Sequence, residues 1–120
     1  MDKKTIDIKR MKQTGGIINL KGKDFVTYKG LLWVAHQHGL QSITTELVAY
    51  EAETNSAIVK ATVSGSRCTC TDYGDASPKN VGRAMINCII RMASTRAKAR
   101  ALRDYLGIGI CSLEELPETD

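Results

Sequence analysis

The sequence predicts an α+β fold in which a three-stranded antiparallel sheet packs on one long C-terminal helix. Residues 41–73 hold three stretches of alternating side chains separated by turns, which is the pattern of an antiparallel meander. Residues 77–105 hold an apolar stripe of helical period, formed by Val81, Met85, Cys88, Met92, Ala99, Leu102 and Leu106. A chain of 120 residues has room for one domain with a modest core.

The chain is expected to begin with a flexible arm. Residues 1–16 are basic and only weakly apolar, and they end in a Thr-Gly-Gly break, which favours a segment that only a partner would order. We therefore place the folded domain at residues 17–112 and a loose acidic tail at residues 113–120.

A short strand and a short helix are expected before the meander. Residues 17–20 are apolar, and a turn with two lysines follows them. Residues 24–28 alternate as a strand does, and residues 30–38 have the apolar side of a short helix that ends at Gly39.

The three strands of the meander are expected at residues 41–50, 57–63 and 67–73. In the first strand, Ile43, Leu47 and Ala49 should share one face. The second strand should present one apolar face, made of Ala57, Val59, Ala61 and Val63. One face of this sheet should pack on the long helix, so the other face must meet solvent or a partner.

The long helix has recognisable ends. Ser77 can cap it, Pro78 suits the first helical position, and Gly107 closes it. Arg96, Arg100 and Arg103 lie within about 60° of one another on the helical wheel, in a row beside the apolar stripe. Like charges at these spacings repel, and a polyanion along the row would remove that cost.

The same row has a second interpretation. Arginines near a helix C-terminus also interact favourably with the helix dipole, and charged rows are usually solvated faces. Lys98 lies on a different face of the helix, where it could serve a contact between subunits.

Charge is segregated along the chain. The net charge is +4, but residues 1–29 carry +5, residues 30–80 carry −2, residues 81–104 carry +5 and residues 105–120 carry −4. Two basic blocks separated by a nearly neutral body indicate a polyanionic partner that is contacted at two places.

The sequence contains no pattern for catalysis, a metal or a cofactor. The cysteines lack zinc-finger spacing, and we expect them to be small buried hydrophobic residues: Cys68, Cys70, Cys88 and Cys111. His36 and His38 point to different sides of a helix and cannot bind one metal together. Trp33 is expected to pack in the core or an interface, with base stacking as the alternative.

No apolar run approaches the roughly 20 residues needed to cross a bilayer, and the N-terminus lacks the hydrophobic core of a signal peptide. The sequence therefore predicts a cytoplasmic protein with no membrane partner.

Three strings carry a resemblance to a known family: GKDFVTYKGLLWVAHQHG, TDYGDASP and MASTRAKARALRDYLGIG. With the order of elements, they resemble the conserved core of the Rad fifty-two superfamily of single-strand annealing proteins, which includes phage recombination proteins of the Erf and Sak types. The last string is the most specific, because it is similar to the family's alanine-rich helix that ends in Arg-Ala-Leu-Arg, an aromatic residue and a glycine. The resemblance covers about residues 20–112.

The resemblance implies a ring or helical filament of identical subunits that holds single-stranded DNA by its backbone and anneals complementary strands without nucleotide hydrolysis. It implies a phage- or plasmid-type protein of a bacterial host, acting in recombination and repair, with a single-strand-binding protein as a further candidate partner. The C-terminal region with which eukaryotic members bind a recombinase lies outside the resemblance, so mediator activity is not expected.

The resemblance also implies a binding site. Arg100 and Arg103 match two arginines at the bottom of the family's DNA groove, Lys21 and Lys23 lie in a turn where the family has basic residues, and Arg67 lies near an outer basic hairpin. The predicted DNA-binding set is therefore Arg96, Arg100, Arg103, Lys98, Lys21, Lys23 and Arg67.

Two other functions fit the same order of elements less well. A double-stranded-RNA-binding module usually places lysines at the start of its second helix, whereas this chain crowds its cations at the end. A small thiol enzyme could use Cys68 or Cys70, yet the sequence has no Walker motif, paired carboxylates, nucleophile elbow or metal spacing.

Overall fold

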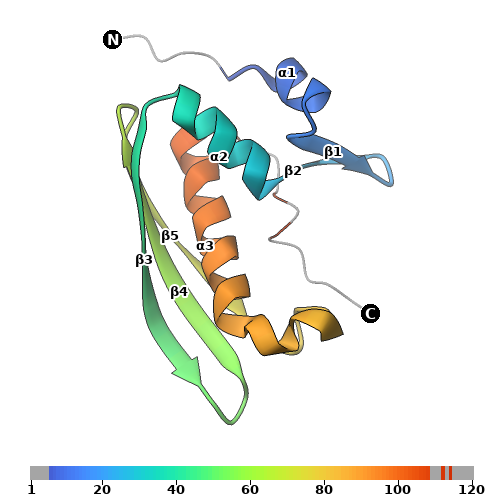
Figure 1. The fold of residues 1–120 in the computed structure, drawn as a ribbon, viewed down its shortest axis with the longest axis vertical. Helices are drawn as coiled ribbons and strands as arrows, with labels where there is room; N and C mark the ends of the chain where they lie inside the picture. Colours follow the sequence, from blue (N-terminus) through green and yellow to red (C-terminus); the bar gives the residue numbers. More distant parts are fainter. Residues whose placement is uncertain (1–5, 109–111, 113, 115–120) are drawn as a thin grey trace.

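The computed structural model describes residues 6–108, 112 and 114. A sheet, the helix α3 (Ile89–Leu106) and the helix α2 (Tyr28–Gln37) are stacked in that order, and a small hairpin projects beside α2 (Figure 1). The predicted α+β class and the packing of a three-stranded sheet on a C-terminal helix are confirmed.

The prediction of a flexible arm at residues 1–16 is wrong for residues 6–16, which the structure describes. The helix α1 (Ile8–Gln13) begins where the Asp7 carboxylate accepts a hydrogen bond from the Arg10 N–H, which satisfies one unpaired donor of the first turn. Met11 is buried and Ile8 packs partly buried against the core, so α1 is anchored to the domain through apolar side chains. Residues 1–5 lie outside the described part of the chain.

The predicted short strand is part of a hairpin. β1 (Ile17–Leu20) pairs antiparallel with β2 (Lys23–Val26), and Lys21 and Gly22 form the two-residue turn between them. Both turn residues have positive φ, at 53° and 83°, which is the conformation that matches the twist of a hairpin. Thr27 then caps α2, because its side chain accepts from the Gly30 N–H.

The meander forms as predicted, except that one residue of the first strand, Ala49, lies on the other face of the sheet from the one predicted. β3 (Leu40–Glu51), β4 (Ser56–Gly65) and β5 (Thr69–Ala76) are antiparallel neighbours in chain order. A register shift between Leu47 and Ala49 adds one residue to β3. The bulge turns Ala49 to the face opposite Leu47, because each added residue reverses the alternation.

The predicted start of the long helix is wrong. Ser77 does not cap it: its N–H donates to the side chain of Asn80, and residues 78–80 form a turn. A 3-10 helix, η1 (Arg83–Cys88), follows, and α3 begins only at Ile89. The end is as predicted, because Gly107 takes the left-handed conformation at φ 69°.

α3 is buried on two sides, against the sheet and against α2 (Figure 1). It approaches the sheet closely at Gly74, where an added Cβ would overlap backbone atoms of Ala93 and Ala97. Ala93 and Ala97 were not part of the predicted apolar stripe of this helix. The members of that stripe from Met92 onward are buried as well. Glycine and alanine on the facing elements let the two backbones touch.

The described residues contain no helix long and apolar enough to span a membrane.

Substituting Gly74 by alanine should destabilise the fold, because the new methyl group would meet the α3 backbone, which cannot move aside as a flexible side chain could. We expect a loss of about 2–3 kcal/mol in the free energy of unfolding, measured by urea denaturation. Thr44→Ala, at an exposed position of β3, is the control and should cost about 1 kcal/mol or less. Equal effects of the two substitutions would contradict the close packing.

Candidate nucleic-acid interface

Arg96 is a buried structural residue. Its side chain is 2% exposed, and its guanidinium donates to the main-chain oxygens of Asp75, Asn80 and Glu114 at 3.1, 2.6 and 2.9 Å, and to Asn80 Oδ1 at 2.8 Å. The prediction that Arg96 lies on an exposed row is therefore wrong. The guanidinium ties β5, Asn80 in the segment before η1, and Glu114 beyond α3 to one point, and its donors are used within the protein.

Arg100 lies one helical turn further along the same edge of the sheet. Its Nη1 donates to the Tyr73 carbonyl at 2.8 Å and lies 3.9 Å from the Asp75 carboxylate. Arg96 and Arg100 thus bond the main-chain oxygens of Asp75 and Tyr73, two residues apart on β5. The i, i+4 spacing on the helix matches the i, i+2 spacing on the strand. Arginine side chains therefore occupy the edge at which a further strand would pair.

Unlike Arg96, Arg100 remains accessible: its side chain is 31% exposed. Arg103 is half-buried and follows on the same side of α3. The predicted row thus keeps two members that solvent can reach, and both lie at the end of α3 closer to α2.

Arg67 also has a structural role. Its Nε donates to the Tyr105 carbonyl at 2.9 Å and its Nη2 to the Leu106 carbonyl at 3.5 Å, so it caps the C-terminus of α3. The Tyr105 hydroxyl, in turn, donates to the His38 carbonyl at 2.8 Å. These contacts hold the β4–β5 turn, the end of α3 and the end of α2 together. The predicted place of Arg67 near an outer basic hairpin did not anticipate this structural role.

The remaining predicted cations lie apart from this edge. Lys98 Nζ stands 5.3 Å from the centre of the Tyr28 ring, a cation–π contact between α3 and α2, and burial followed by the Glu114 charge raises the pKa of Tyr28. Lys21 and Lys23 are exposed in the β1–β2 hairpin, which projects away from α3 (Figure 1). Beside them, a hydrogen bond from Asn19 and then the Lys12 ammonium lower the pKa of Asp24.

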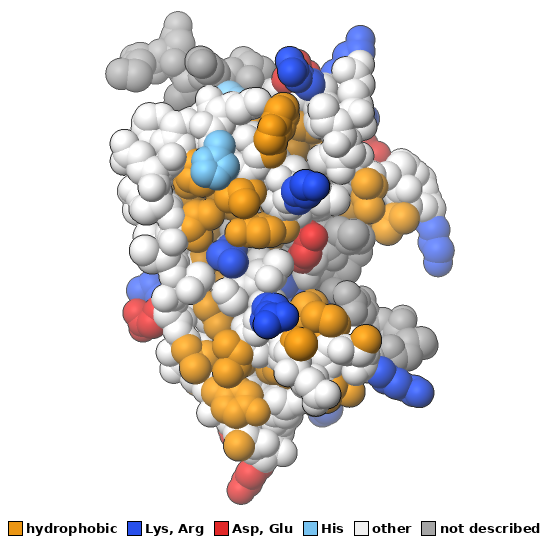
Figure 2. Space-filling model, viewed as in Figure 1, with side chains coloured by type: hydrophobic (Ala, Val, Ile, Leu, Met, Phe, Trp, Pro, Cys, Tyr) orange, Lys and Arg blue, Asp and Glu red, His pale blue; other side chains and the backbone are white. Residues whose placement is uncertain are grey.

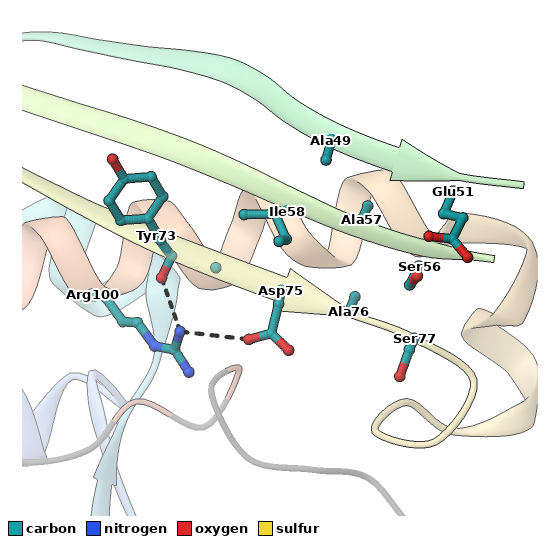
Figure 3. A pocket seen from close by; sticks show the side chains of 11 residues that line it. Ala49, Glu51, Ser56, Ala57, Ile58, Tyr73, Asp75, Ala76, Ser77 and Arg100 are labelled. Atoms are coloured by element: carbon teal, nitrogen blue, oxygen red, sulfur yellow. Dashed lines mark hydrogen bonds and ion pairs between the residues drawn. The ribbon is translucent and has the colours of Figure 1, made fainter. Parts of the chain in front are cut away.

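A hollow of about 550 Å³ lies beside Arg100, across the sheet face that α3 does not cover. Tyr73 of β5, Ile58 of β4 and Ala49 of β3 form its floor, and Arg100 reaches in from the edge of β5 (Figure 3). Asp75 and Glu51 also line the hollow, and the Asp75 carboxylate lies 3.9 Å from the Arg100 guanidinium. The hollow therefore joins an aromatic ring, an aliphatic side chain and a cation.

The opposite edge of the sheet is built differently. Almost every residue of β3 is exposed, including Leu47 at 49% and Val48 at 47%. Figure 2 shows hydrophobic side chains gathered along this side of the molecule, with Lys and Arg beside them. Ile43, Leu47 and Tyr50 face the α3 side of the sheet, as their β4 partners do, but α3 packs mainly over β4 and β5.

The cysteines and Trp33 differ in part from the predictions. Cys70 of β5 and Cys68, just before that strand, lie on the same side, as expected, with their Sγ atoms 3.4 Å apart. They and Cys88 are only half-buried. Cys111 lies outside the described residues. Trp33 is 39% exposed, with the Arg10 guanidinium 5.9 Å from its ring. No cluster of three potential metal ligands occurs among residues 6–108, 112 and 114.

Sequence reasoning missed Tyr73 and Asp75. They alternate with Gly74 on a strand that was predicted to end at residue 73, so their shared face and their proximity to Arg100 were not visible. The only signal was the spacing of TDYGDA, which places Tyr73 and Asp75 on one side of an extended chain.

Comparison with protein-family models, curated proteins and solved structures finds no match to this chain.

Exchanging Arg96 for lysine should destabilise the protein far more than the same exchange at Arg100. A lysine ammonium cannot reproduce the planar fork that reaches Asp75, Asn80 and Glu114 together. We expect Arg96→Lys to cost about 2–4 kcal/mol of unfolding free energy and Arg100→Lys about 1 kcal/mol or less. Urea denaturation of both variants checks this, and similar losses would refute the structural assignment of Arg96.

Proposed function

We propose that this protein binds single-stranded DNA along the β5 edge and anneals complementary strands as an ATP-independent homo-oligomer. The observation that carries the proposal is a pair of partly exposed arginines on one side of α3, Arg100 and Arg103. Arg100 also lines an open hollow whose floor is aromatic and aliphatic. The motif resemblance and the sheet-then-helix order support the same function.

Phosphate contacts would supply the affinity. The segment 81–104 carries a net charge of +5, and phosphodiesters bind guanidinium groups in bidentate geometry. Each neutralised phosphate of a single strand should add about −0.7 to the slope of log K against log salt. A few cations per subunit bind weakly, so several subunits must act on one strand.

β3 is the surface we assign to self-association. It is a 12-residue edge strand with large exposed apolar side chains and no lysine, arginine or proline to discourage pairing. The other edge is occupied by arginines, so a continuous sheet between subunits through β5 is disfavoured. A second copy covering β3 would leave the β5 edge open to DNA.

Replacing Arg100 and Arg103 together by alanine should abolish the acceleration of annealing between two complementary oligonucleotides in the absence of nucleotide. The salt slope of single-strand binding should become shallower by about 1.4, because two phosphate contacts are lost. Lys21→Ala/Lys23→Ala is the charge-matched control on the projecting hairpin.

The assay compares variants of equal oligomer size and equal thermal stability. A larger loss in the hairpin variant than in the arginine variant would move the site to the hairpin. Wild-type protein that binds no single strand at low salt, or that prefers duplex RNA, would overturn the proposal in favour of a double-stranded-RNA-binding module.

Exchanging Asp75 for asparagine should strengthen DNA binding. The Asp75 carboxylate lies 3.9 Å from Arg100 Nη1 and is 62% exposed, so it competes with a phosphate for that guanidinium. We expect affinity to rise about 2- to 5-fold at low salt, with the gain shrinking as salt screens the charge. Fluorescence anisotropy of a labelled oligonucleotide measures it, and weaker binding would contradict this role for Asp75.

A further inference from the structure

We propose that Tyr73 and Ile58 form a stacking platform for one nucleobase of the bound strand, while Arg100 holds the adjoining phosphate. This inference rests on the proposed function and adds to it a base contact at Tyr73, whereas the family resemblance had implied binding by the DNA backbone.

The position of Tyr73 carries the argument. Its side chain is 49% exposed on the sheet face that α3 leaves uncovered, although tyrosine usually buries most of its ring. Figure 3 shows the ring and Ile58 on the same face of the sheet, with the Arg100 guanidinium beside the Tyr73 backbone. Ile58 is 43% exposed and widens the flat apolar surface next to the ring.

Cations flank this platform on two sides. Arg100 reaches the Tyr73 carbonyl from the β5 edge, and Lys60 stands directly opposite Tyr73 in the register of β4, with Glu46 opposite Lys60 on β3. The Asp75 carboxylate, opposite Ile58 in the same register, offsets part of the Arg100 charge. An aromatic ring with cations beside it can bind single-stranded nucleic acid with little sequence preference, because every base has a π face.

Stacking of this kind is compatible with annealing. A base that rests its face on Tyr73 keeps its hydrogen-bonding edge in solvent, where a complementary strand can reach it. The hollow is an open depression across three strands rather than a closed pocket, so it can hold a base without enclosing it (Figure 3).

The test compares a thymidine oligonucleotide with an abasic oligonucleotide of equal length, using fluorescence anisotropy. Tyr73→Ala should weaken binding of the thymidine strand by about 5- to 100-fold and leave binding of the abasic strand within about twofold of wild type. Tyr73→Phe should bind both strands like wild type, since the ring remains. The salt slope should not change, because no phosphate contact is removed.

Trp33→Ala is the matched control, since it removes an exposed aromatic ring from α2 rather than from the sheet. Tyr73→Thr provides a second variant with high strand propensity in case alanine impairs folding. Unchanged binding of the thymidine strand by these Tyr73 variants, or equal weakening for both strands, overturns the platform while the proposed function stands. Wild-type protein that binds neither strand overturns both.

Discussion

The buried guanidinium of Arg96 is the contact on which the rest of the arrangement depends. A charged group at 2% exposure is stable only when its donors are satisfied, and here three main-chain oxygens and one amide oxygen satisfy them. Because those acceptors belong to β5, to the turn before η1 and to the segment after α3, one side chain fixes three parts of the chain. The depth and direction of α3 follow from this contact and from the glycine at position 74.

Fixing α3 in this way gives the two sheet edges different properties. Arg96 and Arg100 bond the outward carbonyls of β5, so that edge is charged and closed to further strands. β3 has apolar side chains, an exposed backbone edge and few charges. Under the proposed function, the charged edge would bind DNA and the β3 edge would bind another subunit, so the two contacts would not compete for one surface.

Local patterns in the sequence were enough to predict the meander, the short helix, the Gly107 stop and the angular position of the arginine row. A helical wheel gives the angle at which a side chain leaves the helix, but not how much of that side chain neighbouring elements cover. It therefore could not show that Arg96 is buried while Arg100 is accessible. The wrong helix start has a related cause. Ser77 and Pro78 suit a helix start locally, but the Asn80 side chain accepts a hydrogen bond from the Ser77 N–H instead. The Asn80 carbonyl accepts a hydrogen bond from Arg96, which is 16 residues away, so a local pattern could not reveal it. The bulge in β3 and the burial of Met11 likewise depend on partners distant in sequence.

The central claim is that single-stranded DNA runs along the β5 edge. Photo-crosslinking of wild-type protein to an oligonucleotide carrying iododeoxyuridine, with the attached peptides identified by mass spectrometry, tests it most directly. The account predicts adducts on β5, at Tyr73 first, and on the C-terminal half of α3. Adducts confined to the β1–β2 hairpin or to β3 would contradict it.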